Sequence, residues 1–304
     1  MLPSDSMSPQ LTILTPTWNR RHLLPRLYDS LVAQQAPHGS FEWLVVDDGS
    51  TDGTSDWLET LIPGAPFPIR VIRQENGGKC RALNFGVEFS HGDWLFILDS
   101  DDKLLPEALI KILNCVSTYR KSDVAVIFGL MQVTGRPNQH KFKNEFTGRF
   151  EDWANSGDLF DTAQIFRTEV LRHFPFPVAD QEKFMAESWL FHKIDRQWLS
   201  RFTNIFMTEA EYQQDGLSAK SLLLRAQAPI SAMRVYSAQL DSNLKILLKI
   251  RAAINFWRYY FHSLRTGKGA SETVSSKWSF ACIPFSFLLF LWDLPEVAKW
   301  NSPR

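Results

Sequence analysis

The sequence predicts an α/β fold with a mainly parallel central sheet flanked by helices, followed by a C-terminal helical extension. Over the first 130 residues, continuous apolar runs of strand length alternate with segments of helical spacing. Continuous apolar strands separated by helices are typical of parallel sheets that are covered on both faces. From about residue 220 onward only helical patterns occur, which predicts the extension.

Each predicted element rests on a local pattern. The five predicted strands are apolar runs at 11–15, 41–46, 69–72, 94–98 and 124–130. A helix is predicted between the first two strands from the spacing of Leu23, Leu24, Leu27 and Leu31. Further helices are predicted at 54–62, 79–89, 106–119, 187–198, 222–240 and 243–264. Residues 135–160 are polar and predict loops or a small hairpin.

The amino-acid composition argues against several classes of protein. The chain has 304 residues, is 44% hydrophobic and carries 33 basic and 33 acidic residues, so its bulk charge gives no indication of a nucleic-acid partner. Its three cysteines are scattered and form no Cys-x-x-Cys pair. This pattern predicts neither a disulfide framework nor a zinc site and fits a reducing compartment. The N-terminus shows no secretory signal, and we expect a cytoplasmic protein.

One apolar segment raises the question of membrane contact. Residues 280–292, FACIPFSFLLFLW, number 13 and contain Pro284, which is short of the roughly 20 residues that span a bilayer. A buried helix is the simpler interpretation. The other is an interfacial segment resting on a membrane, flanked by Lys277, Trp278, Lys299 and Trp300.

Three polar clusters follow three predicted strands. They are Thr15-Pro16-Thr17-Trp18-Asn19, Asp47-Asp48-Gly49-Ser50 and Asp99-Ser100-Asp101-Asp102. Ligands of parallel α/β sheets bind outside the carboxyl ends of the strands. The sequence therefore predicts that the three clusters line one crevice, although each could separately be a turn or a helix cap.

The acidic cluster and a glycine-rich segment predict complementary roles. Asp99 and Asp101 share a side if the chain there is extended, so their carboxylates could hold Mg²⁺ or Mn²⁺. In the segment 76–84, NGGKCRALN, two glycines precede a predicted helix that begins with Lys79 and Arg81. Backbone amides, helix dipole and basic side chains together suit a diphosphate. The alternatives are a solvated acidic turn and a flexible basic turn.

Four blocks of this sequence resemble a known family. TPTWNR, VVDDGSTDGT, ENGGKCRALNFGV and GDWLFILDSDD are similar, in order and spacing, to the successive motifs of family 2 glycosyltransferases, which have the Rossmann-like GT-A fold. A weaker match continues through 161–167 to Tyr212. The resemblance implies a GT-A domain at 1–219, with a nucleotide-sugar-binding half at 8–130 and an acceptor-binding, catalytic half at 131–219. The helical extension, 220–304, lies outside it.

The resemblance also implies residue roles. The nucleotide pocket would be lined by Thr15, Pro16 and Asn19, and the uracil and ribose would be recognised by Asp47 and Asp48. Asp99 resembles the first acid of the D-x-D motif, near metal or ribose, and Asp101 the acid that holds the metal, with Ser100 between them. Lys79 and Arg81 would face the diphosphate. Asp102 could instead cap the following helix.

An inverting sugar transfer also needs a base for the acceptor hydroxyl. The family places an acidic residue, often Glu-Asp, at the start of a helix after the acceptor region, and Glu187 matches that position. Ser188 replaces the second acid, so Asp180 and Glu182 remain alternatives. Segment 212–218, YQQDGLS, resembles the family segment near the donor diphosphate, although a polar turn explains it equally well.

The sequence thus predicts a metal-dependent, inverting glycosyltransferase that uses a nucleotide sugar, most simply a UDP-sugar, with Mn²⁺ or Mg²⁺. The expected acceptor is a glycan or lipid-linked acceptor in cell-surface polysaccharide biosynthesis, with peripheral contact to the cytoplasmic face of the inner membrane. The alternative is a catalytically degenerate sugar-nucleotide-binding subunit of a glycan-assembly complex. A nicotinamide-dependent dehydrogenase is disfavoured because TPTWNR stands where Gly-x-Gly-x-x-Gly would be required.

Overall fold

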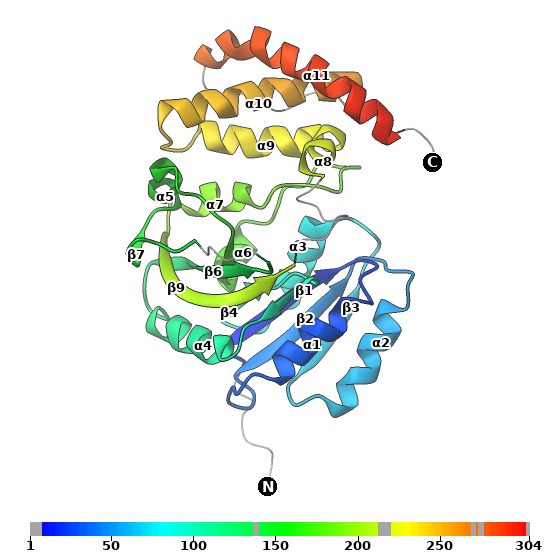
Figure 1. Cartoon of the computed structure of the whole chain (residues 1–304), viewed down its shortest axis with the longest axis vertical. Helices are drawn as coiled ribbons and strands as arrows, with labels where there is room; N and C mark the ends of the chain where they lie inside the picture. The colour runs from blue at the N-terminus through cyan, green and yellow to red at the C-terminus, as the bar shows by residue number, and fades with distance from the viewer. Residues whose placement is uncertain (1–7, 136–139, 212–219, 269–271, 273–276, 302–304) are drawn as a thin grey trace. The chain divides into compact units, whose positions relative to one another are not determined.

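The computed structural model describes residues 8–135, 140–211, 220–268, 272 and 277–301 (Figure 1). The chain forms two compact units, each made of several chain segments. The first comprises residues up to 149 together with 160–175 and 197–213, and the second comprises 150–159, 176–196 and 214–304. Each unit is described by itself below.

A single mixed sheet forms the centre of the first unit. Within the described residues it has nine strands, eight of them in the order β3-β2-β1-β4-β8-β6-β9-β5, with β7 paired to β9. Their bounds are β1 Leu11–Thr17, β2 Phe41–Asp47, β3 Ile69–Arg73, β4 Trp94–Ile97, β5 Asp102–Leu104, β6 Val124–Val133, β7 Phe146–Gly148, β8 Thr162–Arg167 and β9 Leu199–Ala210. The strands β3, β2, β1 and β4 are all parallel, whereas the β8 and β5 pairings are antiparallel. The predicted α/β class is confirmed.

Helices pack on this sheet because their apolar residues recur on one face. The helices of the first unit are α1 Leu24–Val32, α2 Thr54–Leu61, α3 Lys79–Phe89, α4 Ala108–Thr118 and α6 Thr168–His173, with the 3₁₀ turn η1 Ile62–Gly64. In α1, for example, Leu24, Leu27 and Leu31 are buried at the i, i+3, i+7 spacing of a core-facing stripe. The central strands β1 and β2 are buried at every position, as is typical of parallel strands that are covered on both faces.

The register of the parallel strands brings their polar ends together. Thr17, the last residue of β1, is paired with Asp47, the last residue of β2, and Leu14 of β1 is paired with Ile97 of β4. The chain leaves all three strands at the same edge of the sheet, as the sequence predicts.

The expectation that Asp102 caps the helix after β4 is wrong. Asp102 begins the short strand β5, where it pairs with Ala210 of β9, and α4 begins six residues later at Ala108. An edge strand of three residues carries too little pattern to be recognised from sequence alone.

The second unit is helical. Its helices are α5 Phe150–Ser156, α7 Ser188–Ile194, α8 Ser221–Gln227, α9 Pro229–Leu240, α10 Ile246–Arg265 and α11 Ile283–Asn301, with the 3₁₀ turn η2 Lys277–Cys282. A core that includes Met233, Ala253 and Phe256 joins α9 and α10. A buried acid bonds to the N-terminus of α5: Asp195 accepts from the amides of Phe150 and Glu151 at 2.7 and 2.9 Å, which satisfies donors that the helix itself leaves open.

The apolar segment 280–292 lies in η2 and α11, and the interpretation as a buried helix is wrong. Phe285, Leu288 and Trp292 are exposed. By length and composition alone, the stretch Lys277–Lys299 could cross a bilayer, and it is the one such stretch among the described residues. Core helices of soluble proteins have the same length and composition.

Candidate functional site

The ends of β1 and β2 are joined by Asn19. Its backbone amide donates to the hydroxyl of Ser50 at 2.9 Å, and its side-chain oxygen accepts from the amide of Thr51 at 2.8 Å. Asn19 adopts φ 52°, a left-handed conformation that asparagine tolerates better than most residues. The first two predicted clusters are therefore directly bonded to each other.

Thr15 and Pro16 lie within β1 and are buried. The Thr15 hydroxyl accepts a hydrogen bond from the indole nitrogen of Trp43 at 3.0 Å. This contact couples β1 to the side chain of a β2 residue. The partly exposed residue of the first block is Asn19, at the mouth of the crevice.

Asp47 and Asp48 have different partners. Asp47 is fully buried and holds the turn after β2, since its carboxylate accepts from the amide of Ser50 at 2.8 Å and from the hydroxyl of Ser55. Arg73 of β3 lies 4.0 Å from the same carboxylate. These partners are local to the turn, and the Asp47 side chain faces inward.

Asp48 instead organises the glycine-rich segment. Its carboxylate oxygens accept from the amides of Gly77 and Gly78, both at 2.8 Å, and from the side chain of Gln74 at 2.6 Å. Gly78 has φ 91° and ψ 160°, a conformation confined to glycine. The amides of Gly77 and Gly78 are thus donated to Asp48, which fixes the loop at the start of α3.

The glycine of the DDGS turn is required by a close approach. Gly49 has φ 80°, and a Cβ atom there would lie 2.9 Å from the backbone nitrogen of Asn76. The turn after β2 and the glycine-rich segment consequently touch backbone to backbone, and together they form one wall at this edge of the sheet.

Lys79 connects this wall to the acidic cluster. Its Nζ lies 2.6 Å from one carboxylate oxygen of Asp99 and 2.7 Å from the other. Arg81, two residues along α3, donates to the carbonyl of Gly77 at 3.3 Å. The basic segment and the strand-ending acids therefore meet, as the sequence predicts.

The three carboxylates after β4 crowd one another. Burial, followed by the charge of Asp99, raises the pKa of Asp101. Burial, with the charges of Asp99 and Asp101, raises the pKa of Asp102 to about 8. Acids in this arrangement are stabilised by a nearby cation, because an opposite charge favours their ionised forms.

The residues present fit a divalent cation that is shared with a phosphate. Among the described residues, no group of three His, Cys, Asp or Glu side chains could hold a metal by itself. Mg²⁺, however, is commonly bound by one or two carboxylates together with substrate phosphates and water. Asp101 and the half-exposed Asp99 match such an incomplete site.

Arg26 was missed by sequence reasoning, and Thr17, although part of the first predicted cluster, was given no role of its own. Arg26 of α1 donates to the carbonyl oxygen of Asp101 at 3.0 Å and forms an ion pair with Glu211. The sequence held one signal for Arg26: it is a charged residue directly before Leu27, which is buried in α1. Thr17 has a buried hydroxyl that finds no partner within the described part of the chain, and a polar ligand at the strand end would satisfy it.

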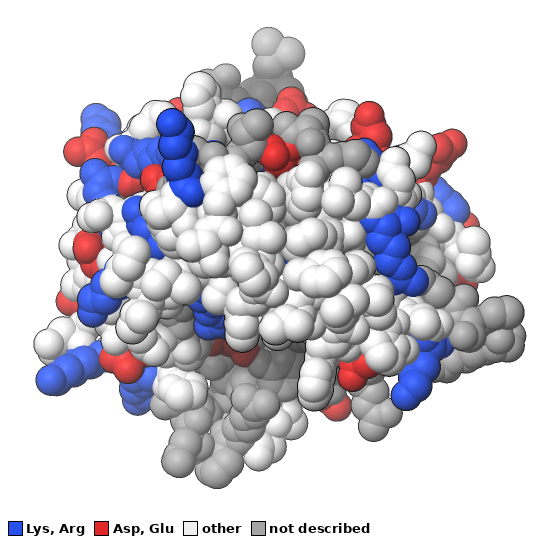
Figure 2. All heavy atoms as spheres, turned by 90° about the horizontal axis from the view of Figure 1, so that it is seen from above, with Lys and Arg blue, Asp and Glu red and all other residues white. Residues whose placement is uncertain are grey.

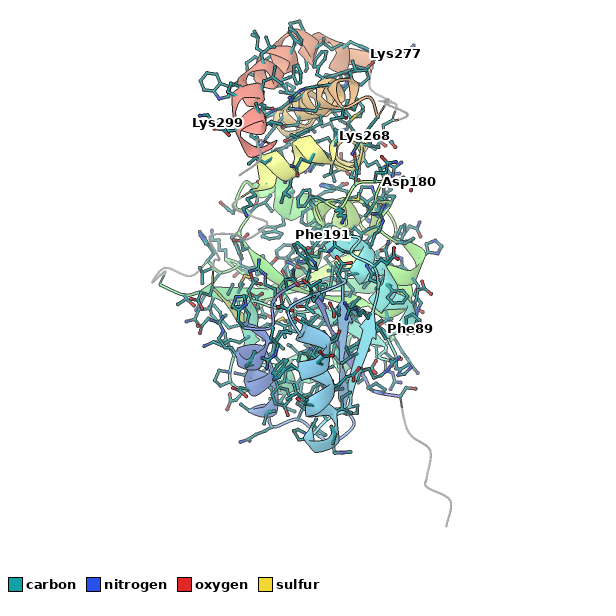
Figure 3. The ribbon with its side chains drawn as sticks, turned by 90° about the vertical axis from the view of Figure 1, so that its right-hand side faces the viewer. Phe89, Asp180, Phe191, Lys268, Lys277 and Lys299 are labelled. Carbon is teal, nitrogen blue, oxygen red and sulfur yellow. The ribbon has the colours of Figure 1, made fainter. Side chains whose placement is uncertain are left out.

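The candidate bases lie in the second unit. Glu187 is half-buried at the N-terminal boundary of α7, and Asp180 is exposed (Figure 3). Glu182 is buried, and its two carboxylate oxygens accept from the amides of Ile230 and Ser231 at 3.0 and 2.7 Å. Glu182 therefore caps α9. The segment 212–218 lies outside the described residues.

The comparison with family models decides the family. The model described as glycosyl transferase family 2 matches residues 12–174, more than half of the chain. The chain belongs to glycosyl transferase family 2. The matched region contains all three strand-end clusters and the glycine-rich segment.

Curated relatives of this chain are also named glycosyltransferases. An uncharacterised glycosyltransferase of Mycoplasma pneumoniae is 33% identical over 109 residues, 35% of this chain and 36% of the relative. A PGL/p-HBAD biosynthesis glycosyltransferase of Mycobacterium tuberculosis is 32% identical over 118 residues, 38% of this chain and 45% of the relative. The chain thus spans less than half the length of these relatives.

Solved structures show the same fold. S. aureus TarS, residues 1–349 in complex with UDP-GlcNAc, superposes with a TM-score of 0.63 at 18% identity, covering 84% of this chain and 73% of that one. The mannosyltransferase PcManGT from Pyrobaculum calidifontis, in complex with GDP-Man and Mn²⁺, gives a TM-score of 0.54 at 17% identity, covering 97% and 84%. At these identities the likeness concerns the fold alone.

Proposed function

We propose that this family 2 member transfers a sugar from a nucleotide-diphosphate sugar, a UDP-sugar in the first instance, to a hydroxyl group of an acceptor. The observation that carries the proposal is the ion pair between Lys79 and Asp99, which places a basic helix start against the crowded acids after β4. Nucleotide sugars bound by similar folds, UDP-GlcNAc in TarS and GDP-Man in PcManGT, support the donor class.

The donor diphosphate would be held from two sides. Asp101 and Asp99 would bind a divalent cation, Mg²⁺ or Mn²⁺, which neutralises charge on the leaving diphosphate when bound. Lys79 and Arg81 would approach the diphosphate from the start of α3. The nucleoside would lie along the wall formed by Asn19 and Asp48, where the unpartnered Thr17 hydroxyl offers a further polar contact.

The acceptor hydroxyl would lose its proton to Glu187. In a single in-line displacement the acceptor oxygen forms its bond to the anomeric carbon while the bond to the diphosphate breaks, which inverts the configuration. The acceptor proton passes to the base, and the diphosphate leaves with the bonding electron pair. Glu182 is the weaker candidate because both its carboxylate oxygens are already bonded to α9.

The proposed acceptor class rests on the family resemblance rather than on the site. We propose a glycan or lipid-linked acceptor in cell-surface polysaccharide biosynthesis, and the similarity to a PGL/p-HBAD biosynthesis glycosyltransferase supports a biosynthetic role. The second candidate function, a sugar-nucleotide-binding subunit without activity of its own, is favoured by Ser188, which stands where an acid would follow Glu187.

The deciding experiment is a panel of UDP- and GDP-sugars, with release of the nucleoside diphosphate measured with Mn²⁺, with Mg²⁺ and with chelator. We expect one donor to be turned over only with a cation, and Asp101→Asn to reduce turnover by about 100-fold or more. Asp93→Asn is the matched control, since Asp93 forms an exposed ion pair with Arg120 elsewhere. Binding of a nucleotide sugar without turnover would favour the inactive subunit, and no binding at all would refute both candidates.

A further inference from the structure

The polarity of α11 and the preceding turn is reversed relative to an ordinary surface helix. Its buried positions include Ser279, Ser286 and Asp293. Its exposed positions include the large apolar side chains of Trp278, Phe280, Phe285, Phe287, Leu288, Leu291 and Trp292. A surface helix of a water-soluble protein places apolar residues inward and polar residues outward. The outer face of α11 therefore has the composition of a surface that contacts an apolar phase.

A buried ion pair holds the polar side of α11 against α10. Asp293, 1% exposed, accepts from Nε of Arg258 at 2.6 Å and lies 3.0 Å from Nε2 of His262. Burial by itself would raise the pKa of Asp293, but the hydrogen bonds from Arg258 and His262 outweigh it and lower that pKa. The carboxylate is thus ionised and paired. Phe287 and Phe290 continue the contact by packing on Phe261 of α10.

This ion pair argues against a membrane-spanning role for α11. Insertion of α11 across a bilayer would separate Asp293 from Arg258 and His262, and it would place an ionised or newly protonated carboxyl group within hydrocarbon. Charged groups inside a bilayer are costly and are found paired or facing water. An arrangement in which α11 stays on α10 and lies in the plane of a surface keeps the pair intact.

The charge of the chain is divided between its two ends. Residues 220–304 carry twelve Lys and Arg against four Asp and Glu, a formal net charge of +8. Because the whole chain has a net charge of +0, residues 1–219 carry −8. The helix α10 has four basic residues and no acidic one: Lys249, Arg251, Arg258 and Arg265. Such asymmetry between parts of one chain is typical of proteins that contact an anionic surface.

The positive charges lie around the apolar face. Figure 2 looks onto the helices of this region and shows a broad uncharged centre, with Lys and Arg side chains, interspersed with Asp and Glu, toward its margins. In Figure 3, Lys277 and Lys299 mark the two ends of the α11 region. Exposed tryptophans beside an apolar face and lysines at its ends match the preferences of the bilayer interface, where indole rings lie at headgroup depth and lysine side chains reach the headgroups.

We propose that α11, held on α10 by the Asp293 pair, docks in the plane of a lipid surface that carries anionic headgroups. The apolar outer face enters the boundary between headgroups and acyl chains, and exposed basic residues at its ends, Lys277 and Lys299, contact lipid phosphates. A lipid surface explains both the exposed aromatic residues and the net charge of +8. A second copy of these helices would also cover the exposed aromatic residues, but the positive charges of the two copies would repel each other.

Vesicle flotation of the full chain tests this proposal. We expect binding to phosphatidylcholine vesicles that contain phosphatidylglycerol, weaker binding to phosphatidylcholine alone, and release by high salt. Trp292, 80% exposed, is the most exposed large side chain of the face, and Trp292→Ser should weaken binding by about tenfold. Protein bound to vesicles should be extracted by alkaline carbonate, as expected for a helix that lies on the bilayer.

Two phenylalanines form a matched pair for the control. Phe287 of α11 and Phe89 of α3 are both 42% exposed, and each packs edge-on against one phenylalanine at 5.0 and 4.9 Å. Phe287→Ser should weaken vesicle binding, whereas Phe89→Ser should leave it unchanged. Circular dichroism of both variants is the control for correct folding.

The remaining outcomes overturn the proposal. Equal binding by Phe287→Ser and Phe89→Ser, absence of vesicle binding, or resistance to alkaline carbonate would each refute docking in the plane. Dimers that are lost in Phe287→Ser would show instead that a second copy covers the face. Nucleotide-sugar binding, measured by calorimetry on the same variants, should not change, so failure here leaves the proposed function untouched.

Discussion

Lys79 and Asp99 form a two-oxygen ion pair, with Nζ 2.6 and 2.7 Å from the carboxylate oxygens. The lysine is the first residue of α3, and the aspartate follows β4, twenty residues later in the sequence. In this pair the lysine occupies a position beside the acids where a bound cation and diphosphate would also lie. The positive charge of Lys79 opposes the rise in the pKa values of Asp101 and Asp102 that burial and the charge of Asp99 cause.

We expect Lys79→Gln to weaken the binding of UDP in the presence of Mn²⁺ by about tenfold, the effect of losing one charge-assisted contact. Titration calorimetry measures this change. Lys103→Gln is the control, because Lys103 of β5 forms a similar ion pair with Glu209 at 3.1 Å without contacting Asp99. Equal affinities for the two variants would show that Lys79 serves the fold and not the donor.

Asp48→Asn should destabilise the glycine-rich segment. An asparagine side chain keeps the size of Asp48 but replaces one accepting oxygen with a donor, so one of the amides of Gly77 and Gly78 loses its partner. Loss of charged hydrogen bonds at a buried site costs about 2 kcal/mol. Denaturant unfolding should show this loss, and hydrogen exchange should increase at the two glycine amides.

Asp56→Asn provides the comparison for Asp48→Asn. Asp56 is exposed in the first turn of α2, where substitutions usually change stability by less than about 0.5 kcal/mol. A similarly small effect for Asp48→Asn would mean that the loop is held by other contacts.

His192 predicts how the stability of the chain depends on pH. Burial, together with the charges of Lys193 and Arg196, lowers the pKa of His192 to about 4. In the unfolded chain a histidine has a pKa near 6.5. At pH values between these two pKa values the unfolded state binds more protons than the folded state. The contribution of His192 to stability is therefore fully present above about pH 6.5 and is lost as the pH decreases toward 4.

The full effect for His192 is about 3 kcal/mol, from 1.36 kcal/mol per pKa unit. Unfolding followed at several pH values should show this loss in the wild type and a flatter profile in His192→Gln. His38→Gln, at an exposed position, should keep the wild-type slope. The same slope in His192→Gln would assign the acid sensitivity to other groups.

The elements that sequence predicted well are those with a repeated pattern. The strands β1, β2, β3, β4 and β6 are continuous apolar runs, and α3 begins at Lys79 as the glycine pair indicates. The strand β9 was missed because its buried and half-buried positions alternate irregularly. The exposed face of α11 could not be predicted, since composition alone does not reveal which side of an apolar helix is covered.

The site was predictable as a location but not in its internal contacts. Parallel strands bring their carboxyl ends together, which is enough to gather the clusters of Asn19, Asp48 and Asp99. The pattern DDGS does not reveal that Asp47 holds its own turn whereas Asp48 holds the segment around Gly78. That division depends on which carboxylate faces β3 and α3, and therefore on tertiary packing.

Glu187→Gln tests the proposed base. A glutamine keeps the size and hydrogen-bonding reach of Glu187 but cannot accept the acceptor's proton, so we expect sugar transfer to fall by a factor of about 10² to 10⁴. Donor binding should remain within a factor of about two, because the proposed donor contacts lie with Lys79, Asp99 and Asp101. The measurement pairs a transfer assay with calorimetry of the nucleotide sugar.

The variant Glu182→Gln tests whether Glu182 is the catalytic base or an acid that only stabilises the fold. Glu182 caps α9 through the amides of Ile230 and Ser231, so its substitution should lower the free energy of unfolding by about 1 to 2 kcal/mol. Transfer per folded molecule should persist. If Glu187→Gln retains transfer while Glu182→Gln or Asp180→Asn loses it without loss of stability, the base is one of those acids and the assignment of Glu187 fails.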